Sequence, residues 1–266
     1  MLPFKCSVHI RRPKSSALVF LYVMIAAGLL IALRRPDQVM NPEVWNEDGI
    51  FVIPQIIQGG FLAVFEPVNG YLIIPSRFIT WLSLLWPLEH YPWISTALGI
   101  LAQSACIAAV AISPTKLRAP VLCAIMLALL PMNAEVYVLP QYTFWWTTVL
   151  LFLALIWIPG AAPMWRNGFI VLGGLSSPIS IILLPLFALR LAMTRQKEDV
   201  ISLATVVLVS AIQLYFIFVG DPAQTESLAV SDALPTISVF FAGWTVFAST
   251  PFALFIGLAV WVVLLG

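Results

Sequence analysis

Two adjacent carboxylates, Glu47 and Asp48, are the residues of this chain best suited to chemistry. Asn46 precedes them, and Gly49 follows them with the backbone freedom that a tight turn needs. Such a pair at a membrane surface can bind a divalent cation, Mg²⁺ or Mn²⁺, or one member can act as a general base. The alternative interpretation is a solvated loop in which both acids cap a helix.

Arg77 is a second candidate, because it lies in an otherwise apolar segment just after Pro75 and Ser76. An arginine in that setting is costly unless its guanidinium reaches the headgroups or finds an anion. The planar guanidinium matches phosphate oxygens, so we expect a lipid phosphate as its partner. The alternative is ordinary snorkelling to phospholipid headgroups.

Glu135 is a third candidate, near the predicted outer end of a helix. It faces either a cavity at the outer leaflet or the headgroup zone at the helix end. The next helix begins with side chains that we expect to anchor it in the interface: Gln141, Tyr142, Trp145 and Trp146.

The composition indicates which elements must position these residues. Apolar residues make up 61% of the 266-residue chain, charged residues only 9%, and the mean hydropathy is +1.01. Soluble domains carry about 25% charged residues, so the chain is predicted to be an integral membrane protein. A net charge of +1 leaves no basic surface for phosphates, which argues against a nucleic-acid partner.

Cysteine and histidine usage excludes several site types. Cys6, Cys106 and Cys123 are scattered and odd in number, so they predict neither a disulfide framework nor a metal site. His9 and His90 are the only histidines, which makes a histidine-based triad or a His-rich metal site improbable.

The first apolar run, Ser15 to Leu33, is long enough to cross a bilayer and follows four basic residues. This pattern predicts a signal anchor with a cytoplasmic N-terminus. Residues 34–90 then form an outer loop with juxtamembrane helices. In that loop, Ile50 to Phe65 is weakly amphipathic and Tyr71 to Trp86 is predicted to lie on the outer surface.

The rest of the chain predicts an all-α, polytopic transmembrane helix bundle with about eight membrane helices. We expect residues 1–266 to form a single transmembrane domain. The last apolar run ends at the final residue without polar closure, so we expect the chain to be truncated at its C-terminus. The further predicted spans are Tyr91 to Ile112, Pro120 to Leu139, Thr143 to Ile158, Val200 to Val219, and Phe240 onward.

Charge placement sets the predicted orientation. All of the 13 basic residues except Arg34, Arg35 and Arg77 fall on the cytoplasmic side if Tyr71 to Trp86 does not cross. The same arrangement needs residues 167–189 to form a hairpin of two short helices, broken at Ser176, Ser177 and Pro178. The length of this stretch would equally suit a single span, but charge placement favours the hairpin.

The order of these segments resembles the GT-C superfamily of polytopic membrane glycosyltransferases. The match lies in the motif "WNEDGIF" followed by "NGYLIIPSRF", which is similar to the acidic-pair loop and second juxtamembrane helix of bacterial GT-C-like membrane proteins. The stretch "GGLSSPISIILLPLFALR" looks like their short paired helices. The family pair is often Asp-Glu, whereas here Glu47 precedes Asp48.

The resemblance implies an inverting transfer of a sugar from a polyprenyl-phosphate donor to an acceptor at the outer face of the membrane. Asp48 or Glu47 would take the acceptor proton, or would position the acceptor through a divalent cation. Arg77 would neutralise the departing phosphate. The residues expected to bind substrate are Arg77, Asn46, Tyr71 and Glu135.

The resemblance also implies the bacterial inner (plasma) membrane as the location, with a lipid-linked sugar and membrane lipid as partners. A transporter or flippase for a lipid-linked saccharide is the alternative function. Transporters usually place ionisable residues within their spans, and the later spans here have almost none. A non-catalytic scaffold is the third hypothesis, and it predicts that the candidate side chains point to unrelated places.

Overall fold

The computed structural model describes residues 16–130 and 134–219, which belong to one compact helical unit. Among these residues there is no strand, only two isolated bridges, so the predicted all-α class is confirmed. The predicted span from Phe240 lies outside the described residues, and the number of about eight membrane helices stays a prediction. Four helical segments are long and apolar enough to cross a membrane: Ala17–Arg34, Asp48–Phe65, Leu88–Ile112 and Lys197–Val219.

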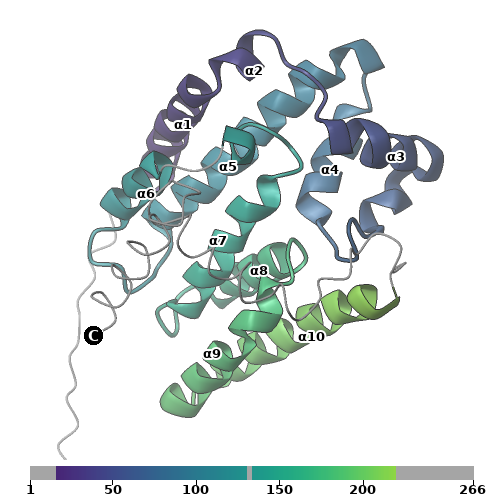
Figure 1. Cartoon of the computed structure of the whole chain (residues 1–266). Coiled ribbons are helices and arrows are strands. Elements are labelled where there is room, and N and C mark those ends of the chain that lie inside the picture. Colours follow the sequence, from purple (N-terminus) through teal and green to yellow (C-terminus); the bar gives the residue numbers. More distant parts are fainter. Residues whose placement is uncertain (1–15, 131–133, 220–266) are drawn as a thin grey trace, which may run out of the picture. The chain divides into compact units, whose positions relative to one another are not determined.

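The first helix packs on two later ones, which lie beside it in Figure 1. Small residues face each other there, since Ala27, Ala124 and Ala128 are all buried. Ile31 and Ile107 fill the space between them. The elements of this layer are α1 (Ser16–Arg34), α5 (Tyr91–Ile112) and α6 (Pro120–Leu129), and α7 (Thr143–Leu155) packs on the other side of α5.

The remaining helices, α8 (Pro163–Gly174), α9 (Ile179–Thr194) and α10 (Lys197–Val219), pack around α7 and each other. Two glycines allow the close approach. A Cβ at Gly173 would lie 2.8 Å from the Thr147 carbonyl oxygen, and one at Gly174 would lie 2.4 Å from Val209 Cγ2. The end of α8 is therefore wedged between α7 and α10.

Residues 167–189 form the predicted hairpin rather than one continuous helix. The chain leaves the helical conformation between α8 and α9 at residues 175–178. Arg166 near the start of α8 and Arg190 near the end of α9 both contact Asp199, so the two helices run in opposite directions. Pro178 helps to end the first helix, because proline lacks the N–H that would continue the ladder.

Asp199 is the centre of a buried ionic cluster at this end of the bundle. Its Oδ1 accepts from Arg166 Nη1 at 2.6 Å and from Arg190 Nε at 2.8 Å, while Thr194 donates to the other oxygen. The arginines also bond carbonyl groups at the end of α7: Arg166 Nε lies 2.9 Å from the Ala154 oxygen. The cluster thus joins α7, α8, α9 and α10 and neutralises the negative end of the α7 dipole.

An irregular, largely buried segment, residues 137–142, links the 3₁₀ turn η4 (Ala134–Val136) to α7 and contacts α5. Irregular backbone in an apolar setting must find hydrogen bonds from elsewhere. Gln103 of α5 supplies them, because its Oε1 accepts from Val138 N at 3.0 Å and its Nε2 donates to Leu139 O at 3.4 Å. Gly99 makes room, since a Cβ there would lie 2.3 Å from the Val138 oxygen.

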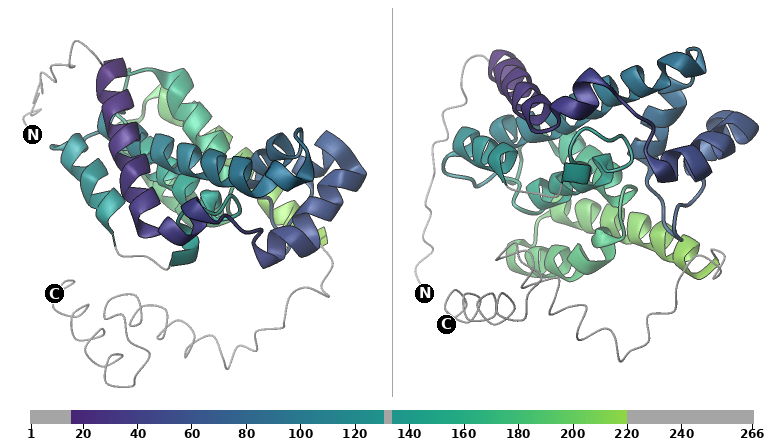
Figure 2. Two further views of the ribbon diagram at one scale, coloured as in Figure 1. Left: turned by 90° about the horizontal axis from the view of Figure 1, so that it is seen from above. Right: turned by 45° about the horizontal axis from the view of Figure 1, so that its top comes forward.

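The chain between α1 and α5 folds into short elements, of which α3 and α4 lie to one side, away from α1 and α6 (Figure 2). Asn69 and Gly70 both have positive φ and connect Val68 to Tyr71, as in a type I′ turn. The α4 helix spans about 15 Å and cannot cross a bilayer of about 30 Å. The elements are α2 (Pro36–Met40), the π turn η1 (Asp48–Val52), α3 (Ile53–Gly59), the 3₁₀ turn η2 (Gly60–Phe65) and α4 (Ile74–Ser83).

The segment Asp48–Phe65 is apolar enough to span but is not one straight helix. Gly60 has φ +60° and ψ −143°, which no continuing helix adopts, so the chain turns there. The five-residue π turn and the seven residues of α3 together reach about 18 Å, well short of the hydrocarbon core. Asp48 therefore does not lie in a straight helix that reaches across the hydrocarbon core, and the surface location of this segment stays a prediction.

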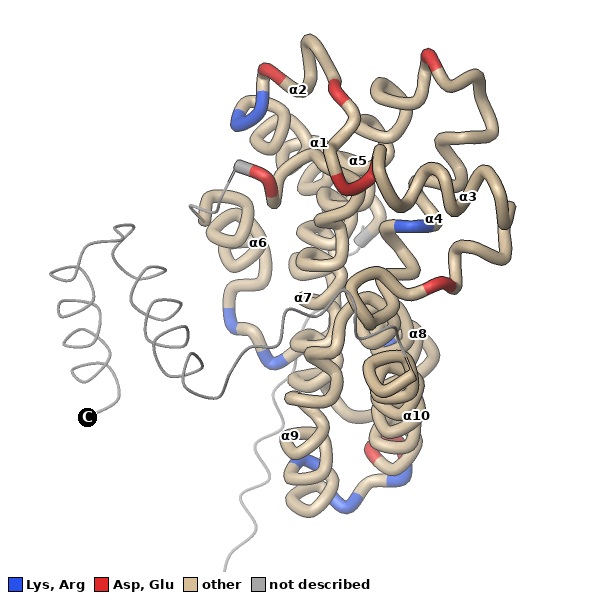
Figure 3. The backbone as a smooth tube through the Cα atoms, turned by 45° about the vertical axis from the view of Figure 1, so that its right-hand side comes forward, with Lys and Arg blue, Asp and Glu red and all other residues tan. Residues whose placement is uncertain are grey.

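Charges separate between the two ends of the described unit (Figure 3). One group of charges lies where α7 and α9 end and where α8 and α10 begin, as the ion pairs at Asp199 show. That basic end carries Lys116, Arg118, Arg166, Arg190, Arg195 and Lys197, together with Glu198 and Asp199. The opposite, acidic end carries Asp37, Glu43, Glu47, Asp48, Glu66, Glu89 and Glu135, with Arg34, Arg35 and Arg77.

We expect Asp199→Asn to destabilise the bundle by about 3–5 kcal/mol, because two buried arginines lose the charge that neutralises them. Thermal unfolding in detergent micelles should show a clearly lower midpoint for this variant. Lys197→Gln, which removes an exposed charge two residues away, should leave the midpoint within about 1 °C of the unmodified chain. Equal midpoints for both variants would contradict the anchoring role of Asp199.

Candidate functional site

The acidic pair sits where a helix is forced into π geometry. Pro54 has no N–H to donate to Ile50 O four residues earlier, so the α ladder is interrupted. The Ile53 N–H bonds instead to Asp48 O, a step of five residues. Such π turns often occur at functional sites, because the extra residue re-aims the side chains around it.

The backbone turns the two carboxylates into different surroundings. Asp48 points inward and is only 2% exposed, whereas Glu47 is half-buried. Glu47 Oε2 accepts from Gln141 Nε2 at 2.6 Å. Ser76 of α4 donates to the Gln141 backbone oxygen at 2.8 Å, so the outer loop, α4 and the chain before α7 meet here.

Several buried oxygens at this place have no hydrogen-bond partner among the described residues. They are Asp48 Oδ1, Gln141 Oε1 and Thr143 Oγ1. A buried polar atom without a partner costs about 1–3 kcal/mol, so such atoms call for an occupant that completes them. We name Glu47, Asp48 and Gln141 the Asp48 cluster, because Gln141 bonds Glu47 and Asp48 is the next residue in the chain.

Arg77 is fully buried inside the protein rather than extended to the lipid headgroups. Its Nε donates to Ala63 O at 2.7 Å, Nη1 to Gln55 Oε1 at 2.8 Å, and Nη2 to Glu66 Oε2 at 3.4 Å. The snorkelling interpretation is therefore wrong for this conformation. Arg77 ties α3 and η2 to α4, and its charge still acts on Asp48.

The other predicted substrate-binding residues lie at different distances from the cluster. Tyr71 is half-buried and feels the charge of Glu47, which together with burial raises the pKa of its hydroxyl. Glu135 is linked to this site indirectly, because the Tyr142 hydroxyl interacts with both Trp45 and Glu135. Asn46 is exposed, and no described hydrogen bond draws its side chain into the cluster.

Two residues that sequence reasoning assigned to the membrane interface have other roles. Gln141 is buried and bonds Glu47, so it belongs to the Asp48 cluster. Trp146 is only 1% exposed, and its indole N–H donates to Val136 O at 2.9 Å, so it is a core residue rather than an aromatic anchor. Trp145, the neighbour, is exposed as expected. The sequence around Gln141 gives no local signal of this role, because the contact with Glu47 joins residues 94 positions apart.

Burial and the adjacent charge of Glu47 set the protonation of Asp48. Desolvation disfavours the carboxylate, Glu47 repels it, and Arg77 partly offsets both, so the pKa of Asp48 rises to about 7. Burial, with the charges of Glu47 and Glu135, also raises the pKa of Tyr142 to about 12, which keeps its hydroxyl a hydrogen-bond donor.

The predicted divalent cation is not tested by this structure, although the residue types of the Asp48 cluster include oxygen ligands. Mg²⁺ prefers oxygen ligands and usually binds through one or two carboxylates, with water or substrate oxygens completing the shell. Asp48, Glu47 and the amide oxygen of Gln141 are ligands of this kind. Within residues 16–130 and 134–219, no group of three or more His, Cys, Asp or Glu side chains could hold a metal on its own.

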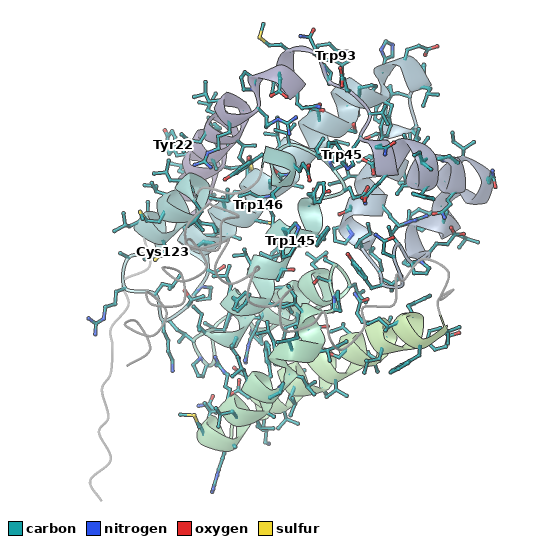
Figure 4. The ribbon with its side chains drawn as sticks, viewed as in Figure 1. Tyr22, Trp45, Trp93, Cys123, Trp145 and Trp146 are labelled. Atoms are coloured by element: carbon teal, nitrogen blue, oxygen red, sulfur yellow. The ribbon has the colours of Figure 1, made fainter. Side chains whose placement is uncertain are left out.

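Trp45 contacts the residue that follows Gln141 in the chain. Its ring packs edge-on against Tyr142, with ring centroids 6.1 Å apart, and it lies between α3 and α5 in Figure 4. Gly49 contacts the same stretch, since a Cβ there would lie 3.3 Å from Val44 Cγ1. Trp45 therefore packs near the Asp48 cluster, whose aspartate is only 2% exposed.

Comparisons with family models, with curated proteins and with solved structures found no match for this chain.

The raised pKa of Asp48 predicts a pH-dependent stability. The folded state holds this proton up to about pH 7, whereas the unfolded chain releases it near 3.8, so stability should fall as pH rises between these values. Between pH 5 and pH 8 the loss should be about 2–3 kcal/mol. Thermal unfolding in detergent should therefore give a higher midpoint at pH 5 than at pH 8.

Asp48→Asn should flatten this dependence, because the amide does not titrate. Glu43→Gln, which changes an exposed acid in the same loop, should leave the dependence as it is. A slope that survives in Asp48→Asn would show that other groups cause it.

Proposed function

We propose that the chain is a membrane glycosyltransferase of the GT-C kind. In this proposal it moves a sugar from a polyprenyl-phosphate donor to an acceptor hydroxyl at the outer face, with inversion at the anomeric carbon. The observation that carries the proposal is the buried carboxylate of Asp48, which has one oxygen without a partner, follows a second acid in the chain and feels the charge of Arg77.

Asp48 has the properties of a general base. A base works best when its pKa lies near the working pH, and the pKa of Asp48 is raised to about 7. Its free Oδ1 would accept the acceptor hydroxyl at about 3 Å as the proton is transferred. Since Asp48 is only 2% exposed, the acceptor would bind as the Trp45 side of the loop moves outward.

The donor phosphate needs cationic or hydrogen-bonding partners. Arg77 is fully buried and each of its three nitrogens has a partner, so in this proposal its charge would act on the phosphate through the field rather than by direct contact in this conformation. A divalent cation on Glu47 and Asp48 would supply further charge for the departing phosphate, as metal ions do in phosphoryl chemistry.

The location of the Asp48 cluster supports an outer-face reaction. The cluster lies at the acidic end of the described unit, whereas most of the described basic residues lie at the other end (Figure 3). Positively charged ends face the cytoplasm, so the proposal puts the basic end inside and the Asp48 cluster outside.

The transport alternative gains no support from the polar side chains midway along α5 and α10. Gln103 and Gln213 are neutral, fully buried and bonded to backbone groups. Gln213, for example, bonds both the N–H and the carbonyl of Leu72. These amides hold irregular backbone in place and do not line a path for charge.

Single cysteines should report the orientation. In a chain whose three natural cysteines are replaced by alanine, Glu43→Cys should react with a membrane-impermeant maleimide added to intact cells. Lys197→Cys should react only after the cells are opened, because both positions are exposed but lie at opposite ends. The reverse pattern would place the Asp48 cluster in the cytoplasm and end the outer-face proposal.

Asp48→Asn should lower sugar transfer by about 10²–10⁴-fold, because the amide cannot take a proton. The assay is transfer from a polyprenyl-phosphate sugar in membranes, with membrane content of the variant measured in parallel. Glu43→Gln serves as the matched control and should keep its activity, since Glu43 is an exposed acid five residues away. Undiminished transfer in Asp48→Asn would remove Asp48 from the catalytic role.

A further inference from the structure

An apolar groove runs along the side of the bundle, far from the Asp48 cluster. It has a volume of about 230 Å³ and lies where α1, α5 and α6 meet. Ala26 and Tyr22 form its α1 side and are exposed, whereas Ala27, Ile107 and Ala124 form its buried floor. Tyr22 and Cys123, labelled in Figure 4, mark the α1 and α6 sides of this region.

A cation stands at one end of the groove. Leu30 is the last α1 residue that lines it, and Arg34 follows one helical turn later. The Arg34 guanidinium donates to the Leu130 carbonyl at 2.7 Å, bonds the Tyr137 hydroxyl, and lies 4.9 Å from the Tyr137 ring centroid. It therefore bridges α1 to the end of α6, one helical turn beyond Leu30.

Arg34 differs from the other arginines at the acidic end. Arg35 pairs with Asp37 at 2.8 Å, and Arg77 pairs with Glu66. Among the described residues, no carboxylate lies within ion-pair distance of Arg34. Its charge is thus available to an anion that approaches from the lipid side.

The spacing of cation and groove matches a phospholipid. A helix rises 1.5 Å per residue, so the groove residues Leu30, Ala26 and Tyr22 lie about 6, 12 and 18 Å below Arg34. A phosphate at the level of Arg34 would leave one hydrocarbon chain beside these residues. Only 11% of the α1 segment is buried inside the protein, so the bilayer reaches the groove directly.

We propose that this groove binds one chain of an anionic phospholipid whose phosphate pairs with Arg34. Alanine and aliphatic side chains line the groove, and a cation follows it by one turn of α1, which suits one hydrocarbon chain with an anionic headgroup. An alkyl chain is narrow enough to lie along the alanine floor, and the guanidinium fork suits phosphate oxygens.

Lipid retention in native mass spectrometry tests this proposal. The whole chain is purified in detergent and mixed with equal amounts of phosphatidylglycerol and phosphatidylcholine. We expect at least a fivefold preference for phosphatidylglycerol. Arg34→Gln should abolish the preference, and Ala26→Phe, which fills the groove from its exposed side, should abolish retention of both lipids.

Arg118→Gln is the matched control, because it removes an exposed arginine at the opposite end and should keep the full preference. Thermal unfolding midpoints of all variants, measured without added lipid, show whether they fold. A folded Arg34→Gln protein that keeps the preference would overturn the proposal, as would equal retention of the two lipids.

Two further results would assign the groove to another occupant and so overturn the proposal. One is retention of a polyprenyl phosphate but not of phosphatidylglycerol, which would make the groove a donor site. The other is a dimer that Ala26→Phe converts to a monomer, which would make the groove an interface between two copies. If inorganic phosphate alone bound as well as phosphatidylglycerol does, the hydrocarbon chain would have no role, and this too would overturn the proposal.

Discussion

The structure depends on one constraint, that irregular backbone inside an apolar bundle must still make its hydrogen bonds. Long polar side chains meet this need at each break in the helices. Gln103 bonds the irregular chain before α7, and Gln213 bonds both Leu72 and the Gly174 carbonyl where α8 ends. Arg166 and Arg190 do the same for carbonyl groups at the end of α7.

The same constraint explains why the Asp48 cluster is buried. The loop after α1 has to pack its own turns, and Arg77 donates a second hydrogen bond to the Ala63 carbonyl, which also accepts from Glu66 N. Its burial holds η2 against α4, and the π turn at Pro54 aims Asp48 into the same packed region. Asp48 and its unpartnered oxygen are thus inside the protein because the loop folds against α4 and α7.

The two ends of the bundle use charge differently. At the basic end a single aspartate neutralises two arginines, and the cluster holds four helices together. At the acidic end the carboxylates outnumber the paired cations, and burial, with the charge of Glu47, raises the pKa of Asp48 to about 7. One cluster therefore stabilises the fold, whereas the other has the uncompensated groups that chemistry or cation binding would need.

The sequence by itself determined the all-α membrane class, the surface loop and the break between α8 and α9, because hydropathy, charge and proline act locally. It also singled out Glu47 and Asp48. Only the tertiary structure decided that Arg77 is buried and that Gln141 bonds Glu47, since these contacts join residues far apart in the chain. Burial of a polar side chain depends on what packs over it, and no local pattern encodes that.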